Sequence, residues 1–211
     1  MKKIRTALYN VLPGEKAHAT MAPQPKYIEG VEGIHASPPV NSAVLVLIVP
    51  YENELAIPFI QRSQQGRYHR GQIAFPGGKM EKEDADALQT ALRECHEEIG
   101  VPEEKVSILG VLSDIYIPLS NFNITPIVGT TLQLPAFTLS QQEVDQVILV
   151  KLSDLFNDAN KTTHSFNRHN QEIIAPGYKI GEHFIWGATA MIVAELEQLM
   201  KTNTFNHLGK L

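Results

Sequence analysis

The sequence predicts an α/β protein in which a β-sheet is packed between helices. Short apolar runs rich in β-branched residues, typical of strands, recur between residues 43 and 152. Two longer segments, 84–99 and 187–201, carry apolar residues at helical spacing instead. Strands and helices mixed along one chain in this way indicate a sheet covered by helices.

Composition indicates a folded domain with a small-molecule partner. Of the 211 residues, 43% are hydrophobic and 19% are charged, which is enough to bury one sizeable core. The net charge is −5. Nucleic acids and anionic membranes both favour a basic surface, so we expect neither as a partner. A small anionic substrate stays compatible with this charge.

Three features of the sequence favour a cytoplasmic location. The single cysteine, Cys95, has no partner for an internal disulfide, which is typical of reducing compartments. No apolar run follows the basic residues 1–5, as a signal peptide would require. The longest apolar run, residues 43–50, is too short to cross a bilayer.

The chain divides into an N-terminal lead-in over residues 1–39 and a domain over residues 40–211. Residues 1–12 are compatible with a short helix, and residues 13–39 are rich in Pro, Gly and Ala. This second part is predicted to be irregular, either as an arm over the domain or as a contact with another chain. A homodimer is therefore left open.

The clearest strand is the continuous apolar run 43–49, which is predicted to be buried on both faces. Residues 55–60 are its expected partner across a short turn, and 72–75 form a shorter strand that ends at Pro76-Gly77-Gly78. Further strands are expected over 106–112, 124–128 and 146–152.

The clearest helix is predicted over 84–99. Its apolar face consists of Leu88, Ala91, Leu92, Cys95 and Ile99. Acidic residues crowd the expected first turn, as the helix dipole favours, and Gly100 and Pro102 terminate the helix. Cys95 is expected to be buried rather than nucleophilic, and His96 is expected to be exposed.

Three glutamates on this helix form a candidate metal site. Glu94, Glu97 and Glu98 are spaced three and four residues apart, so they share a helix face, which we expect to lie opposite the apolar stripe. Three neighbouring anions repel one another, and hard divalent cations such as Mg²⁺ take oxygen ligands. Arg93 is placed to orient a neighbouring carboxylate. A solvated surface face is the alternative interpretation.

The diglycine before this helix favours the metal interpretation. Gly77 and Gly78 permit tight backbone conformations and the close approach of a ligand. A metal–carboxylate cluster beside such a turn is suited to binding and polarising a diphosphate. Lys79, which follows, is a candidate for a phosphate contact or for simple exposure to water.

The stretch from Gly78 to Val101 resembles the Nudix box, G-x5-E-x7-R-E-U-x-E-E-x-G-U, where U is aliphatic. The matching residues are Gly78, Arg93, Glu94, Glu97, Glu98, Gly100 and Val101. Asp84 stands where the first glutamate is expected, and eight residues rather than seven precede Arg93. The resemblance implies that residues 40–211 form a Nudix α/β/α sandwich with a mixed sheet. It also implies a pyrophosphohydrolase that requires Mg²⁺ or Mn²⁺.

Residues 67–78 resemble the segment L-R-x-H-x-G-Q-[VI]-x-F-P-G-G of the coenzyme A pyrophosphatase branch, with Gly66 in place of the leucine. This implies hydrolysis of coenzyme A, or of its acyl or oxidised derivatives, to 3′-phosphoadenosine 5′-phosphate and 4′-phosphopantetheine or its derivative. Two alternatives stay open. One is a Nudix hydrolase for ADP-ribose, a dinucleotide or a nucleoside triphosphate. The other is a non-catalytic nucleotide-sensing module, which the intact box carboxylates disfavour.

Roles follow from this resemblance and from the residue types. The predicted metal ligands are Glu94, Glu97 and Glu98, and the predicted catalytic residues are Arg93, Glu94, Glu97 and Glu143. Glu94 and Glu143 are both candidates for the general base, although Glu143 is equally compatible with a cap near Ser140. The predicted substrate-binding residues are Arg62, Arg67, Arg70, Gly77, Gly78 and Lys79.

Two aromatic residues near the C-terminus are candidates for further contacts with substrate. Tyr178 and Trp186 are suited to stacking on adenine or to lining a pantetheine channel. Packing in the core is the alternative for both, and it is the favoured interpretation for Trp186.

Overall fold

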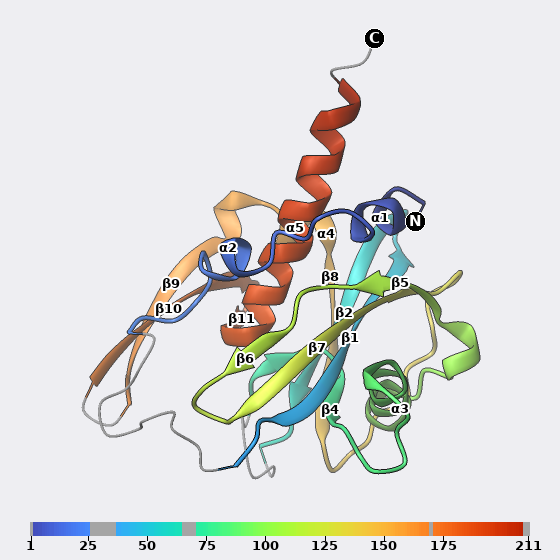
Figure 1. Ribbon diagram of the computed structural model, residues 1–211, viewed down its shortest axis with the longest axis horizontal. Helices are drawn as coiled ribbons and strands as arrows, with labels where there is room; N and C mark the ends of the chain where they lie inside the picture. Colours follow the sequence, from blue (N-terminus) through green and yellow to red (C-terminus); the bar gives the residue numbers. More distant parts are fainter. Residues whose placement is uncertain (1, 26–36, 65–70, 169–170, 209–211) are drawn as a thin grey trace.

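The computed structural model describes residues 2–25, 37–64, 71–168 and 171–208 (Figure 1). The helices are α1 (Lys2–Leu8), α2 (Glu15–His18), α3 (Ala87–Ile99), α4 (Leu152–Leu155) and α5 (Gly187–Leu208). The strands of the larger sheet are β1 (Val40–Tyr51), β2 (Glu54–Arg62), β3 (Ile73–Ala74), β4 (Gly77–Lys79), β5 (Ser107–Val111), β6 (Ile115–Ile117), β7 (Phe122–Thr130) and β8 (Val144–Lys151). The smaller sheet contains β9 (Lys161–Arg168), β10 (Gln171–Ile180) and β11 (His183–Trp186).

The larger sheet is mixed, and the prediction of an α/β fold is confirmed. Its main strand order is β3-β2-β1-β7-β5, and β4, β6 and β8 pair with β1, β7 and β2. β1 and β7 run parallel, whereas the other pairs are antiparallel. The sheet therefore has its parallel pair at the centre, where both faces are covered.

Strand β1 is buried on both faces, as its continuous apolar run predicts. Val46 and Ile48 belong to the core shared with α5, whereas Leu45 and Leu47 belong to the core shared with α3. All four side chains are fully buried. Because side chains alternate along a strand, this single run supplies both layers of the sandwich. Figure 1 shows α3 on one side of the sheet and α5 on the other.

Helix α3 begins later than its periodicity predicts. It starts at Ala87, after Asp86 accepts a hydrogen bond from the Gln89 backbone N–H as an N-cap. The expectation that acidic residues occupy the first turn is wrong, because these residues lie in the preceding loop. The C-terminus is as predicted, with Gly100 in the left-handed conformation at φ 72°.

Besides β6, two regions form strands that were not predicted from the sequence. Residues 77–79 were expected to end a strand, but they form β4 and pair with residues 42–44 of β1. The hairpins of the smaller sheet, over 161–186, contain polar runs together with Pro176 and Gly177. Neither region shows the apolar alternation by which strands are recognised.

The N-terminal segment packs onto the domain through a buried carboxylate on α5. Glu195 accepts hydrogen bonds from the Gly14 backbone N–H at 3.0 Å and from the Ser113 hydroxyl at 2.6 Å. Its other oxygen lies 2.8 Å from Nε2 of His18, and the side chain is fully buried. Further along the chain, Gln24 forms an isolated β-bridge with Ile174 of β10.

In the described part of the chain, no helix is long and apolar enough to cross a membrane.

We expect Glu195→Gln to lower the free energy of unfolding by about 2 kcal/mol at pH 7, since hydrogen bonds to a charged group are lost. Burial by itself raises the pKa of Glu195. Hydrogen bonds from His18 and Ser113 have the opposite and larger combined effect, so the pKa of Glu195 lies below its ordinary value of 4.5. The stabilisation is therefore present above pH 4.5 and is lost as the pH falls through the lowered pKa. Urea denaturation of both proteins between pH 7 and 3 measures this difference. A gap that does not narrow in acid would contradict the assignment.

Candidate active site

The buried carboxylate of Glu98 joins the box helix to the diglycine strand. Glu98 is 1% exposed and accepts a hydrogen bond from the Gly77 backbone N–H at 2.9 Å. Nη2 of Arg62, on β2, lies 3.9 Å from its other oxygen. The expectation that Glu98 lies opposite the apolar stripe is therefore wrong, because β4 packs against α3 at this position.

The pKa values of two glutamates in this region are raised. Burial raises the pKa of Glu98 to about 8, and the carboxylates of Glu94 and Glu143 add to this effect, whereas Arg62 and the Gly77 N–H oppose it. Burial is also the main cause of the raised pKa of Glu94. Burial penalises the charged form, and neighbouring anions penalise it further. A cation held between these carboxylates would reverse both effects.

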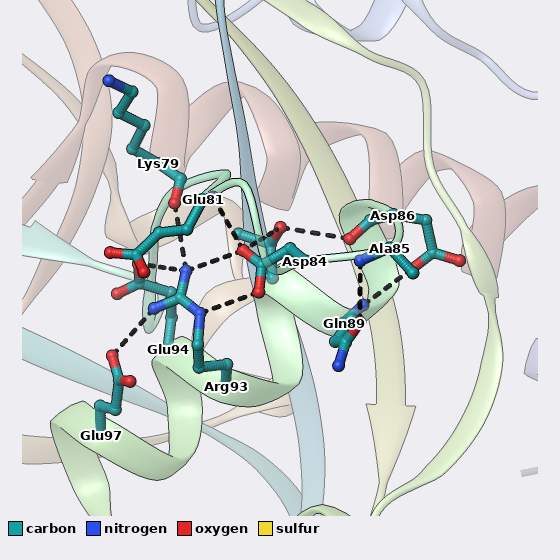
Figure 2. Close-up of polar contacts among 10 residues, drawn as sticks. Lys79, Glu81, Asp84, Ala85, Asp86, Gln89, Arg93, Glu94 and Glu97 are labelled. Carbon is teal, nitrogen blue, oxygen red and sulfur yellow. Dashed lines mark hydrogen bonds and ion pairs between the residues drawn. The ribbon is translucent and has the colours of Figure 1, made fainter.

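Arg93 links the loop before α3 to the glutamates on it (Figure 2). Its guanidinium donates to both oxygens of Asp84 at 3.0 Å and to Glu97 at 2.9 Å. It also lies 3.1 Å from Oε1 of Glu94 and donates to the Lys79 carbonyl at 3.1 Å. A planar guanidinium with several donors suits such a junction. In this arrangement Arg93 positions the glutamates.

Asp84 is a residue of this network to which the sequence analysis assigned no role. Its side chain is 2% exposed and also accepts from the Glu81 backbone N–H and the Thr90 hydroxyl. The hydrogen bonds from Arg93 hold the pKa of Asp84 far below its ordinary value. Its role could have been predicted from the sequence, because Asp84 stands where the Nudix box has its first glutamate. The extra residue before Arg93 leaves the pairing of Asp84 with Arg93 intact.

The other candidate residues occupy different environments. Glu97 is 54% exposed, and Lys79 is exposed. Glu143 is exposed on the turn before β8, where its carbonyl accepts from the Ser63 backbone N–H at 2.8 Å. Its carboxylate still raises the pKa of Glu94 and Glu98, so it lies near the acidic cluster, by which we mean Glu94, Glu97 and Glu98. Arg67 and Arg70 lie outside the described residues.

Four side chains test the predictions about packing. Cys95 is buried, and burial raises the pKa of its thiol to about 12, as expected for a core residue. His96 is exposed, as expected. Tyr178 is fully buried beside Glu197, so it is part of the core. Trp186 is only partly buried, and the core interpretation favoured for it is wrong.

Among the described residues, no group of three or more His, Cys, Asp or Glu side chains is already arranged to hold a metal ion. Glu94 and Glu97 are both turned toward the guanidinium of Arg93. Glu98 instead points to the backbone of β4.

Gly78 leaves room for the Glu94 carboxylate, and we expect Gly78→Ala to reduce activity at least tenfold while changing stability by less than about 1 kcal/mol. A Cβ at this position would lie 2.5 Å from Cδ of Glu94. The carboxylate is the flexible end of a side chain, so it moves at little energetic cost but loses its position. Steady-state hydrolysis and thermal melting measure the two effects.

Gly77→Ala provides the contrast. Here the backbone has φ 156°, and a Cβ would collide with the backbone of Ala43 and Val44 in β1. This substitution should reduce stability as well as activity. Equal losses of stability in both variants would contradict the assignment of Gly78 to the site.

Residues 41–169 match the NUDIX domain. The chain belongs to the Nudix family. The uncharacterized Nudix hydrolase NudL of Pectobacterium atrosepticum is 34% identical over 158 residues, which cover 74% of this chain and 80% of that protein. The human mitochondrial coenzyme A diphosphatase NUDT8 is 34% identical over 174 residues, covering 79% of this chain and 72% of that protein. This Nudix protein is accordingly a pyrophosphohydrolase.

The fold of this Nudix hydrolase also occurs in solved structures. The MutT protein of Methanosarcina mazei Go1 aligns with a TM-score of 0.53 at 17% identity, covering 80% of this chain and 98% of that one. The architecture is thus shared although the sequences have diverged. Nudix hydrolases generally use divalent metal cations and act on small nucleotide substrates.

Proposed function

We propose that this Nudix hydrolase cleaves the diphosphate of coenzyme A, or of its acyl or oxidised derivatives. The products would be 3′-phosphoadenosine 5′-phosphate and 4′-phosphopantetheine or its derivative. The observation that carries the substrate class is the 34% identity to human coenzyme A diphosphatase over 79% of this chain. The resemblance of residues 67–78 to the coenzyme A branch supports the same class.

The residues of the acidic cluster fit a divalent cation. Burial raises the pKa values of Glu94 and Glu98, and the negative charge of Glu143 raises both pKa values further. Such oxygen donors suit Mg²⁺ or Mn²⁺. We propose that Glu94, Glu97 and Glu98 hold the ion. Arg93 contacts Glu94 and Glu97 and orients these two carboxylates. When bound, the ion supplies Lewis-acid polarisation of a phosphoryl oxygen and lowers the pKa of a coordinated water.

Hydrolysis needs a base and cations that bind phosphate. Water adds to one phosphorus of the diphosphate and the bridging P–O bond breaks, so that each product keeps one of the two phosphates of the diphosphate, while the 3′-phosphate stays on the adenosine product. Glu94 and Glu143 are the candidates to accept the proton of that water. Arg62 lies beside Glu98 with its side chain 35% exposed, so it can also face the substrate. We propose that the diphosphate lies close to the backbone of Gly77 and Gly78. Lys79 is the next residue in the chain.

The proposal is tested with the purified protein and Mg²⁺ or Mn²⁺. The panel contains coenzyme A, its acyl and disulfide forms, ADP-ribose, NADH, diadenosine polyphosphates and nucleoside triphosphates. Products are identified by mass spectrometry. Glu97→Gln serves as the site variant, and Glu104→Gln, which changes an exposed glutamate outside the box, serves as the matched control.

The outcomes separate the candidate functions. Release of 3′-phosphoadenosine 5′-phosphate from coenzyme A, lost in Glu97→Gln and kept in Glu104→Gln, supports the proposal. Cleavage of another nucleotide with coenzyme A untouched would overturn the substrate while keeping the site. Nucleotide binding without any cleavage would overturn catalysis by this chain.

A further inference from the structure

Aromatic side chains line an open recess on the smaller sheet. The residues of this recess are distant in sequence from the acidic cluster. The recess has a volume of about 180 Å³ and is lined by His164, Ser165, Phe166, Phe184 and Trp186. The first three belong to β9 and the last two to β11, the two outer strands of the sheet. Side chains from both edges thus converge over the central strand β10.

The aromatic rings are held in place by contacts with one another and with β10. His164 and Phe184 are stacked, with centroids 3.9 Å apart and planes inclined by 14°. Phe166 meets the edge of Trp186 at 5.0 Å. A Cβ on Gly177 would lie 2.8 Å from Cζ of Phe184, so the absence of a side chain at this position lets the ring lie close to the strand. The recess is therefore built into the fold before any ligand arrives.

The lining of the recess favours a flat, uncharged ring. No Asp, Glu, Lys or Arg is found among the described residues that line it. The aromatic faces offer stacking, while the Ser165 hydroxyl, the His164 ring nitrogens and the Trp186 N–H offer hydrogen bonds. Whole small-molecule sites usually measure at least about 300 Å³, so a recess of 180 Å³ accommodates one part of a larger ligand.

The recess is connected to the active-site strand through β3. β11 contacts β3, and the Thr189 hydroxyl, three residues after Trp186, donates to the Ile73 carbonyl at 3.3 Å. Ile73 in turn precedes Gly77 by four residues, and the Gly77 N–H binds Glu98. The sheet that carries the recess therefore contacts β3, the strand that leads into Gly77, where we propose that the diphosphate lies. A nucleotide carries one flat ring of the required kind, its base.

We infer that the aromatic recess binds the purine base of the nucleotide substrate, by stacking on Phe166 and Trp186. The identity of the nucleotide rests on the proposed function, but occupancy of the recess is measurable without catalysis. Trp186 is the single tryptophan of the chain, so its fluorescence reports on the recess alone. The probes are AMP, 3′-phosphoadenosine 5′-phosphate and pantetheine, titrated in the absence of divalent cations.

Saturable quenching of Trp186 by AMP and 3′-phosphoadenosine 5′-phosphate, without an effect of pantetheine, is the expected result. Phe166→Ala should raise the Kd for AMP roughly 5- to 100-fold, the range that loss of one stacking contact gives. It should raise KM for coenzyme A while leaving kcat little changed, since binding to the base is common to the ground and transition states. Phe166→Leu, which keeps apolar bulk without the flat ring, guards against a folding defect. Tyr9→Ala changes an aromatic residue that is 80% exposed and serves as the matched control.

Quenching by pantetheine alone would assign the recess to the apolar arm and overturn the inference. No fluorescence change with any probe, or equal Kd values in Phe166→Ala and Tyr9→Ala, would also overturn it. Quenching by AMP in a protein that does not cleave coenzyme A would leave the base site standing and reject the proposed substrate. The failure of one proposal is thus distinguishable from the failure of the other.

Discussion

Glu98→Gln is expected to reduce hydrolysis about 10³-fold or more, the loss expected when several kcal/mol of metal-assisted stabilisation of the transition state are removed. Glutamine keeps an oxygen that can accept the hydrogen bond from the Gly77 N–H, so the local fold is preserved. It removes the negative charge that we propose to hold the cation. Initial rates with coenzyme A, together with calorimetric titration of Mn²⁺, measure the two consequences.

The same substitution should leave the metal-free protein as stable as the wild type or more stable. Burial raises the pKa of Glu98 from 4.5 to about 8, so the folded state holds the proton more tightly than the unfolded state. The carboxyl group therefore costs stability as the pH rises from 4.5 toward 8, and the neutral amide does not.

Melting temperatures at pH 5 and pH 8, without divalent ions and with Mn²⁺, test this reasoning. Glu98→Gln should melt above the wild type at pH 8 without metal, and Mn²⁺ should stabilise the wild type more. Glu104→Gln is the control. A variant that melts far below the wild type at both pH values would contradict the assignment of the charge to function.

Asp84→Ala is expected to lower the free energy of unfolding by about 3 kcal/mol, because removing one partner of a buried ion pair leaves the other uncompensated. The side chain of Asp84 is 2% exposed, and that of Arg93 is 20% exposed. The substitution also removes the acceptor for the Thr90 hydroxyl and the Glu81 N–H. Urea denaturation measures the loss.

Activity should fall in Asp84→Ala as well, since Arg93 positions Glu94 and Glu97 only while it is itself held. Glu83→Ala, which changes an exposed acid one residue earlier, should stay within about 0.5 kcal/mol of the wild type. Asp84→Asn retains an acceptor oxygen but not the charge, so its stability should lie between those of Asp84→Ala and Glu83→Ala. Stability unchanged in Asp84→Ala would show that the ion pair with Arg93 does not hold the loop.

The sequence alone determined the elements that rest on local pattern. The apolar run 43–49 predicts a strand buried on both faces, and β1 is such a strand. The periodicity of 84–99 predicts α3 and its end at Gly100. The spacing of Arg93 and Glu97 brings these two side chains together, because residues four apart on a helix are neighbours.

Only the tertiary structure decided which of these groups are buried and what they contact. Glu98 meets Gly77 across 21 residues of sequence, and a helical pattern does not say which face another strand will cover. Strand β9 is mostly polar, and β10 is interrupted by Pro176 and Gly177, so their pairing carries no periodic signal. His164 and Phe184, twenty residues apart, meet only because two hairpins place β9 and β11 on opposite sides of β10. Local spacing specifies which side chains share a helix face, whereas burial and the meeting of distant strands depend on how the whole chain packs.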